Sequence, residues 1–515
     1  MTNPLLNQSG LPDFAHILPS HVEPAIDHLL ARNRERIKEL LGSIDEPTWA
    51  NLIEPLDEWD DELDRAWSPV SHLNAVMNSD ELRDAYNACL PKLSDYATEM
   101  GQNEALYSAY KRLADSDQGL NEAQRKVLEN ALRDFHLSGI DLPADKKTRY
   151  KDVSQQLSKL SSQYSDNLLD ATNAWSRHFS DVNALTGLPQ SALDLSAQIA
   201  EQRGQQGWML TLDYPSFFPV MTYADDRELR REVYEAYNTR ASDQGPHDSK
   251  FDNSRLMDEI LALRHEQAQL LGFASYAERS LATKMADSTD EVVNFLNDLA
   301  RRSKPQAENE LQELREFAAG LGLDDLQPWD VGYYAEKLRH QRYEISQEEL
   351  KPYFPETRVI PGMFKVMSRL FDVSFHEVEG VESWHPDVKF YEVLDPQGHE
   401  VAQFYFDLYA RPNKRGGAWM GTCQSRLVNS SRCQLPVAYM TCNFTPPVGD
   451  KPSLLTHTEV ETLFHEFGHG LHHMLTRIDY PAIAGIHGVA WDAVELPSQF
   501  MDNFCWQREA LALFS

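Results

Sequence analysis

Apolar residues recur at three- and four-residue intervals over most of the chain up to about residue 340, a spacing that predicts amphipathic helices. In residues 18–41, for example, Val22, Ile26 and Leu29 fall on one helical face. The N-terminal part contains four such stretches, over residues 18–41, 62–77, 87–118 and 121–135. Pro69 lies inside the second stretch, and because proline lacks a backbone N–H, we expect it to break or kink that helix.

The helical pattern continues after a break near residues 140–143. A long helix is predicted from Lys146 to about Phe179, with a packing stripe formed by Leu157, Leu160, Tyr164 and Leu168. Residues 208–222 are short, mixed and β-like, and Pro215 and Pro219 limit their length. Helices return over 226–274 and from 289 to 320, the latter interrupted at Pro305. Because the loops are short, we expect helical lobes that pack against one another rather than separate domains joined by flexible linkers.

After residue 338 the pattern of apolar residues changes from one typical of helices to one typical of strands. Residues 389–394 and 400–406 are two apolar runs joined by Asp395–His399, a hairpin-like sequence with glycine in the turn. Residues 435–444 form a third run. We therefore predict a mainly α protein with a small antiparallel sheet. Three regions are expected: an N-terminal helical region (1–145), a helical lobe (146–340), and a region (341–515) that holds the sheet and the candidate catalytic helix.

The composition narrows the possible partners. The 515 residues include 80 Asp+Glu against 48 Lys+Arg, a formal net charge of −32. Nucleic acid and anionic membranes need a basic surface, so this balance argues against both as partners. The charge fits a soluble protein whose copies repel one another, and we expect a monomer. The 42% of hydrophobic residues are enough for a large core.

The lack of a recognisable signal peptide or membrane span, together with the cysteine usage, predicts a cytoplasmic location. No apolar run approaches the length of a membrane span, and the first residues lack the basic start and apolar core of a signal peptide. The five cysteines are sparse and odd in number, which indicates reduced thiols rather than a disulfide framework.

The candidate chemistry lies in residues 456–475, which contain His465-Glu466-Phe467-Gly468-His469. Residues four apart on a helix share a face, so both imidazoles can bind one metal ion. Glu466 is one step around the helix and can reach a water on that ion without being a ligand. This is the arrangement of a zinc hydrolase with one Zn²⁺ ion.

Local signals support a helix here. Two overlapping capping boxes, starting at Thr456 and Thr458, fit its N-terminus. A buried stripe is expected from Val460, Leu463, Phe464, Phe467, Leu471 and Met474. Gly468 and Gly470 each cost roughly 1 kcal/mol against alanine, which suggests close approach of another backbone or of a substrate.

A catalytic zinc site needs a third protein ligand, and two candidates are present. His472 follows His469 by three residues, whereas Glu495 lies in a second stretch that can start a neighbouring helix. Ligands seven residues apart on one helix are separated by roughly 10.5 Å along its axis, so we favour Glu495 and keep His472 as the alternative. With Glu495 as ligand, the side chains that could orient the ligands are His472, His473, Asp492 and Glu461.

Gly416 and Gly417 form a loop before the third β-like run. They can be a plain turn, or a loop that lets a peptide backbone pass closely. A sheet directly before the candidate helix also offers an edge strand, which could hold an extended peptide by β-augmentation.

The motifs together resemble the M3, or thimet oligopeptidase, family of zinc metallopeptidases. H-E-F-G-H-G-L-H-H followed by V-E-L-P-S-Q carries the resemblance. Further stretches are similar to the bacterial oligopeptidase A branch and cover nearly all of the chain: LPDFAHILPSHVEPAI at the start, PWDVGYYAEKLR (328–339), KPYFP (351–355) and KRGGAW (414–419).

The resemblance implies a mostly helical fold with two lobes flanking a deep channel, and zinc on the channel floor. It implies that short unfolded peptides enter while folded proteins are excluded. It assigns His465, His469 and Glu495 as zinc ligands and Glu466 as general base, which takes a proton from the zinc-activated water and passes it to the leaving amine. The expected function is therefore that of a zinc-dependent oligopeptidase that hydrolyses internal peptide bonds.

Two alternatives follow from the same resemblance. A peptidyl-dipeptidase of the family would remove C-terminal dipeptides instead of cutting internally. Family members also continue with a helical segment whose His and Tyr residues contact substrate and oxyanion, whereas this sequence stops at Ser515 in what reads as mid-helix. The second alternative is therefore a catalytically incomplete fragment that binds zinc and peptides.

Overall fold

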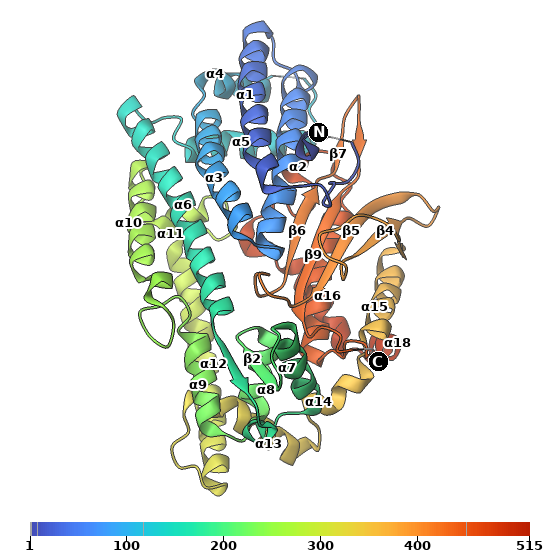
Figure 1. Cartoon of the computed structure of the whole chain (residues 1–515). Helices are drawn as coiled ribbons and strands as arrows, with labels where there is room; N and C mark the ends of the chain where they lie inside the picture. Colours follow the sequence, from blue (N-terminus) through green and yellow to red (C-terminus); the bar gives the residue numbers. More distant parts are fainter. Residues whose placement is uncertain (1–2, 8, 117, 450) are drawn as a thin grey trace.

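The computed structural model describes residues 3–7, 9–116, 118–449 and 451–515 (Figure 1). Helices dominate, so the predicted mainly α fold is confirmed. The N-terminal helices lie at the top of Figure 1, the sheet lies at the right, and long helices run down the left side. Among the described helices, none has the length and apolar character needed to cross a membrane.

Five helices form the N-terminal bundle: α1 (Pro19–Ser43), α2 (Glu54–Val76), α3 (Asp80–Gly101), α4 (Glu104–Ala114) and α5 (Glu122–Leu137). The break expected at Pro69 is wrong, because α2 runs unbroken through this residue. Leu63, Ala66, Val70 and Leu73 are buried on either side of it. Tertiary packing of this face outweighs the loss of one backbone hydrogen bond.

The next region is a series of helices with one short antiparallel pair of strands. The elements are α6 (Ala144–Ala174), β1 (Ser176–Phe179), α7 (Gln190–Gln202), β2 (Trp208–Thr211), α8 (Tyr214–Tyr223), α9 (Arg227–Asn238), α10 (Ser254–Leu270), α11 (Tyr276–Leu281), α12 (Thr289–Gly320), α13 (Pro328–Tyr343) and α14 (Gln347–Leu350).

Three predictions in this region are wrong. The long helix ends at Ala174 rather than near Phe179, because residues 176–179 pair antiparallel with β2. The β-like stretch predicted over 208–222 holds only for β2, and residues 214–223 form a helix, since Pro215 occupies its first turn, where no N–H partner is required. The helix α12 continues through Pro305, whose neighbours are exposed, so water can satisfy the carbonyl that loses its partner.

The third region contains a five-stranded sheet and the candidate helix. Its elements are α15 (Glu356–Phe371), β3 (Ser374–Glu377), β4 (Lys389–Leu394), β5 (Glu400–Tyr409), β6 (Trp419–Gln424), β7 (Leu427–Val428), β8 (Cys433–Gln434), β9 (Val437–Phe444), α16 (His457–Met474), α17 (Leu496–Asp502) and α18 (Arg508–Phe514). The strand order is β3-β4-β5-β9-β6, so β6 is an edge. The sheet was expected to be antiparallel, but it is mixed, because β5 and β9 run parallel.

The sheet is buried on both faces, which makes it a rigid support for α16. Phe404 and Phe406 of β5 belong to the core shared with α15 and α16, and Phe404 contacts Phe467 at 5.4 Å between ring centroids. Tyr405, between them, faces the core of the N-terminal bundle, where it contacts Phe14 at 5.5 Å. This alternation is the normal period of a strand, and it fixes the register of the sheet.

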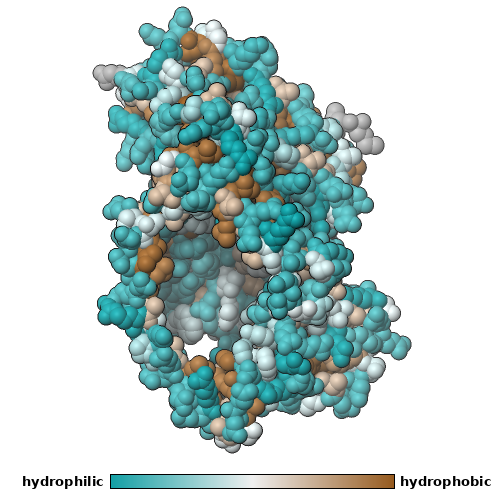
Figure 2. Space-filling view, turned by 90° about the vertical axis from the view of Figure 1, so that its left-hand side faces the viewer, coloured by the Kyte–Doolittle hydropathy of each residue, from teal (hydrophilic) through white to brown (hydrophobic). Residues whose placement is uncertain are grey.

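A channel of about 1000 Å³ lies between the long helices and the sheet. Its wall is formed by α2, α3, α6, α7, α8 and α9, the loop 414–418 and the first turns of α16. Figure 2 shows the hollow from the left side of Figure 1, with mainly hydrophilic surface around its mouth. Tyr164 and Leu168, predicted to pack as a core stripe, are each 37% exposed and line this channel instead.

Candidate active site

The helix α16 forms as its local signals predict. Thr456 is the N-cap and makes a capping box with Glu459, so the first of the two predicted boxes is the one used. All six residues of the predicted stripe are buried. Because this face packs on the sheet, the opposite side of α16 is held toward the segment that follows it.

Two imidazoles and one carboxylate converge beside α16. The Nε2 atoms of His465 and His469 each lie 3.1 Å from the same oxygen, Oε2 of Glu495. The three ligand atoms lie within 4.8 Å of one another, and this group, within the described part of the chain, does not include His472. Ligand atoms on one tetrahedral zinc ion lie about 3.3 Å apart, so the donor set fits zinc and leaves a fourth position for substrate or water.

Glycine allows Glu495 to reach the histidines. Glu495 is the N-cap of α17, and α17 packs directly on α16 at Gly468. A Cβ at Gly468 would lie 2.6 Å from Ser498 Cα and 2.7 Å from Pro497 O, which are backbone atoms. The predicted close approach of another backbone is therefore confirmed. At Gly470 the neighbour is a side chain, since its Cβ would meet Met440 Sδ at 2.7 Å.

Two residues of α17 hold the candidate ligands in place. Ser498 Oγ donates to Glu495 Oε2 at 2.8 Å, and Asp502 Oδ2 lies 3.3 Å from His465 Nδ1. A carboxylate on the far nitrogen of a ligating histidine fixes the ring orientation and tautomer. The sequence analysis missed Asp502, although it lies on the same short helix as Ser498 and one turn further along.

Other residues proposed to orient the ligands serve different parts of the structure. Asp492 accepts hydrogen bonds from the backbone N–H groups of Met285 and Ala286, at 2.9 and 3.0 Å, and so ties this segment to the loop that precedes α12. Glu461 accepts a hydrogen bond of 2.6 Å from Trp506 Nε1.

The neighbouring histidines also lie outside the cluster. His473 is fully buried with Nε2 3.1 Å from Gln424 O, and burial lowers its pKa to about 4. Burial likewise lowers the pKa of His472, whose Nδ1 has no hydrogen-bond partner among the described residues.

Glu466 lies at the edge of the sheet. Its side chain is 7% exposed, and burial together with the negative charge of Glu495 raises its pKa to about 7, against the lowering effect of His465 and of the Met420 backbone N–H. A cation bound by the neighbouring histidines would favour the ionised form. Since Met420 belongs to the edge strand β6, a peptide held along that edge would pass the Glu466 carboxylate.

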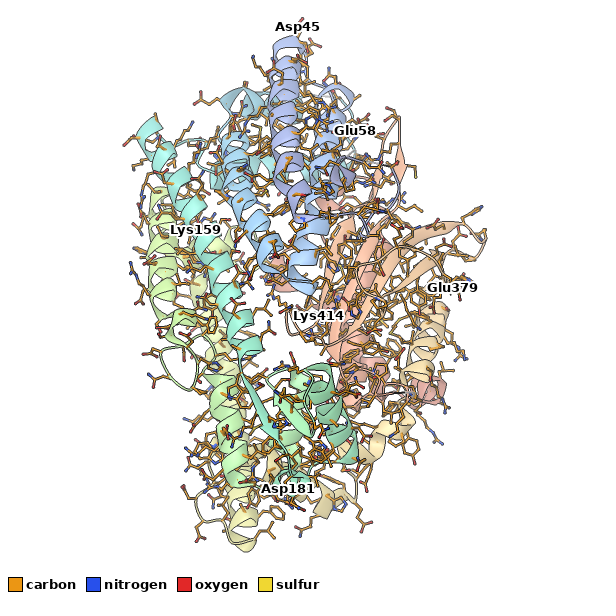
Figure 3. The ribbon with its side chains drawn as sticks, in the orientation of Figure 1. Asp45, Glu58, Lys159, Asp181, Glu379 and Lys414 are labelled. Atoms are coloured by element: carbon orange, nitrogen blue, oxygen red, sulfur yellow. The ribbon has the colours of Figure 1, made fainter. Side chains whose placement is uncertain are left out.

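A buried ion cluster supports the loop that leads into β6. Lys414 is fully buried, and its Nζ donates to Asp407 Oδ1 at 2.8 Å and to Tyr409 O at 2.7 Å. Arg411 makes two further bonds to the Asp407 carboxylate, at 2.6 and 2.7 Å. Figure 3 labels Lys414 at the margin of the sheet that faces the long helices. The loop is therefore fixed at its base.

Gly416 and Gly417 present bare backbone to the channel. Both line it, and a Cβ at either position would have no atom within 4 Å. Gly417 has φ +95°, a conformation that side chains other than glycine's rarely adopt. The space beside these residues is thus open to a substrate backbone.

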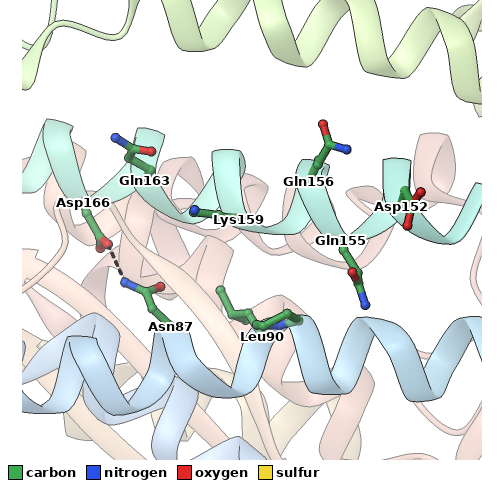
Figure 4. Close-up of a pocket in the computed structure, with 9 residues that line it drawn as sticks. Asn87, Leu90, Asp152, Gln155, Gln156, Lys159, Gln163 and Asp166 are labelled. Atoms are coloured by element: carbon green, nitrogen blue, oxygen red, sulfur yellow. Dashed lines mark hydrogen bonds between the residues drawn. The ribbon is translucent and has the colours of Figure 1, made fainter. Parts of the chain in front are cut away.

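A second hollow of about 580 Å³ lies between α3 and α6 (Figure 4). Most of the residues around it are polar, but the surface they turn toward it is mainly apolar, and Asn87 donates to Asp166 at 3.2 Å across one end. Leu90 and Asp166 line both this hollow and the main channel, so the wall between the two is thin.

Comparison with known proteins gives matches along most of the chain. The model for Peptidase family M3 matches residues 220–515, and the model for the Neurolysin/Thimet oligopeptidase N-terminal domain matches residues 26–147. The chain is 55% identical to Oligopeptidase A of Escherichia coli (strain K12), with 100% of this chain and 76% of the relative covered. It is 31% identical to Dipeptidyl carboxypeptidase of Salmonella typhimurium, with 98% and 74% covered.

A solved structure shares the fold. It comes from Bacillus anthracis str. Ames, is named as an oligoendopeptidase F, and aligns with a TM-score of 0.54 over 96% of this chain and 72% of its own. At 17% sequence identity, this likeness concerns the fold alone.

Proposed function

Because the chain belongs to peptidase family M3, we propose that it is a zinc-dependent oligopeptidase that hydrolyses internal bonds of short unfolded peptides. One observation carries the proposal: His465 and His469 both reach the same Glu495 oxygen, at 3.1 Å, while Glu466 sits beside them at the sheet edge. A zinc ion bound there would act as a Lewis acid, polarising the peptide carbonyl and lowering the pKa of water.

The chain's own residues supply the remaining steps. Glu466, which the bound cation would keep ionised, accepts a proton from the attacking water and donates it to the nitrogen of the leaving amine. Asp502 and Ser498 keep His465 and Glu495 in the orientation that binding requires. The edge strand β6 would hold the substrate extended by backbone hydrogen bonds.

The channel supports a preference for short, unfolded substrates. Its volume of about 1000 Å³ suits an extended peptide and is far too small for a folded domain. The 55% identity to Oligopeptidase A, against 31% to a Dipeptidyl carboxypeptidase over similar coverage, favours internal cleavage over removal of C-terminal dipeptides. The net charge of −32 and the five unpaired cysteines support a cytoplasmic monomer.

The test is mass spectrometry of a peptide mixture, about 5 to 30 residues long, incubated with the protein. Cleavage at internal bonds that stops with a chelator and returns with zinc is the expected result. Removal of C-terminal dipeptides only would instead identify a peptidyl-dipeptidase. Stoichiometric zinc binding without any cleavage would show that this chain is a catalytically incomplete binding fragment.

A further inference from the structure

We propose that Arg415 binds a carboxylate of the substrate on the C-terminal side of the scissile bond, principally the free C-terminal carboxylate of a short peptide. This inference rests on the proposed function, because it concerns the substrate of the same site. It begins with the cations that line the channel: Arg240, Lys351, Lys414 and Arg415.

Three of these cations are already engaged. Lys414 is buried on Asp407, and Lys351 pairs with Glu348 at 2.7 Å. Arg240 donates to Tyr237 O and Thr172 Oγ1, at 2.8 and 3.1 Å.

Arg415 differs from the other three. Its side chain is exposed to the channel, and within the described part of the chain its guanidinium makes neither a hydrogen bond nor an ion pair, whereas the Arg240 guanidinium has two hydrogen-bond partners. Its one aromatic contact is loose, with the guanidinium carbon 5.9 Å from the Trp419 ring centre. In a protein of net charge −32, a free cation inside the channel provides a local attraction for an anionic group that the rest of the surface repels.

The backbone that carries Arg415 is held firmly. Its N–H donates to Ala75 O at 2.7 Å, and Asn443 Nδ2 donates to the carbonyl oxygens of Arg415 and Gly417 at 2.9 and 2.6 Å. The buried ion cluster at Lys414 fixes the preceding residue. Only the side chain is therefore free to adjust, so binding a carboxylate would order few groups and cost little conformational entropy.

The position of Arg415 along the chain limits its distance from the reacting bond. It precedes Met420, whose N–H faces Glu466, by five residues. An extended chain spans at most about 3.6 Å per residue, so the two backbone positions lie within roughly 18 Å. For an extended peptide, a carboxylate held near the Arg415 backbone then belongs to a residue within about five positions of the scissile bond.

The direction of β6 determines which end of the peptide reaches Arg415. An antiparallel peptide along β6 has its C-terminal half toward Trp419 and the glycine loop, and antiparallel pairing is the slightly more stable arrangement per residue. A parallel peptide would instead bring its N-terminal ammonium toward the guanidinium and be repelled. The preference for antiparallel pairing and the repulsion of an N-terminal ammonium both place the C-terminal end of the peptide at Arg415. The backbone of Gly416 and Gly417, which carries no side chains, lies beside it. A guanidinium can bind such a group with two parallel hydrogen bonds.

The experiment compares one cleavable peptide in three forms: a free C-terminal acid, a C-terminal amide, and an amide with Glu as the last residue. For the unsubstituted protein we expect kcat/KM for the acid to exceed that for the simple amide by about 10-fold, mainly through KM, as for a charge-assisted hydrogen bond. Arg415→Gln should reduce this ratio to about one. Arg415→Lys keeps the positive charge but cannot make two parallel hydrogen bonds to one carboxylate, so it should retain part of the preference for the acid.

The third peptide identifies the source of the carboxylate. If the terminal carboxylate is bound, the Glu-containing amide behaves like the simple amide; if an acidic side chain suffices, it behaves like the acid in the unsubstituted protein only. An acid-to-amide ratio that Arg415→Gln leaves unchanged would overturn the inference while the peptidase remains.

Binding separates failure of the inference from failure of the proposed function. In zinc-loaded Glu466→Gln protein, calorimetric titration measures affinity for the acid and the amide without turnover. Adding Arg415→Gln should weaken binding of the acid about 10-fold and reduce the difference from the amide. If neither peptide is cleaved by the unsubstituted protein, this titration still decides the role of Arg415: equal affinities with and without Arg415 would refute it.

Discussion

Gly468→Ala tests how the third ligand is positioned, because it places a methyl group where α17 packs on α16. The new Cβ would lie 2.6 Å from Ser498 Cα and 2.7 Å from Pro497 O, whereas ordinary contact begins at 3.4 Å. The shortfall is about 0.7–0.8 Å against two backbone atoms of α17, so the start of α17 must move as a unit. Glu495 lies three residues before Ser498 and would move with it.

The expected effect is larger on metal binding than on stability. Overpacking costs about 1–3 kcal/mol, while alanine returns roughly 1 kcal/mol of helix propensity, so the free energy of unfolding of the metal-free protein should fall by about 0–2 kcal/mol. Metal sites tolerate displacements of only about 0.2 Å. A shift of Glu495 by several times that amount should weaken zinc binding about 10- to 100-fold, the range seen when groups supporting a ligand are removed.

Gly470→Ala is the matched control, two residues further along the same helix. Its Cβ would meet the Sδ of Met440 at 2.7 Å and Cε at 3.3 Å, which belong to the end of a flexible side chain that can turn away. Zinc affinity is measured by competition with a chromophoric chelator, and helix content by far-UV circular dichroism. The reasoning is refuted if the Gly468 variant binds zinc as tightly as the Gly470 variant.

Three further predictions concern catalysis, metal binding and acid stability. Glu466→Gln should keep its zinc, measured by atomic absorption, but lose turnover about 10²- to 10⁴-fold; near-normal turnover would remove Glu466 as the base. Glu495→Ala should lose zinc in equilibrium dialysis while His472→Ala retains it, and the reverse result would make His472 the third ligand. Burial lowers the pKa of His72 from 6.5 to about 3, so only the unfolded chain takes up this proton as the pH falls below 6.5. His72 should therefore contribute roughly 3 kcal/mol to the loss of stability between pH 7 and 4; urea titrations should show a correspondingly smaller loss in His72→Phe, and equal losses would contradict this assignment.

The parts of the site that rest on local signals could be predicted from the sequence. The cap at Thr456, the buried stripe and the facing imidazoles of α16 all depend on residues within four positions of one another. Gly468 and Gly470 indicated close packing because two poor helix formers next to candidate ligands need a compensating contact. These signals do not require knowledge of the remaining fold.

What the sequence analysis missed depends on contacts between distant segments. The strand β6 carries a glycine and no clear alternation, and it exists because it pairs with β9. Asp502 acquires its role only when α17 docks on α16, which no local pattern shows. The two prolines predicted to interrupt helices fail to do so for different reasons: Pro69 lies in a face of α2 that is packed against the core, whereas Pro305 lies in an exposed stretch of α12.

The docking of α17 on α16 also has a consequence for the lifetime of the protein. The proposed metal would add a link between two segments that already pack closely at Gly468 and at the His465–Asp502 pair, and the Glu495 side chain is half exposed. A ligand that binds only the native state stabilises it by about 2.7 kcal/mol at 100 times its dissociation constant. Transient detachment of α17 would then be roughly 100-fold rarer with metal bound. Zinc supply would thereby control both turnover and the rate at which other proteases nick this segment, making the metal-free protein the short-lived form.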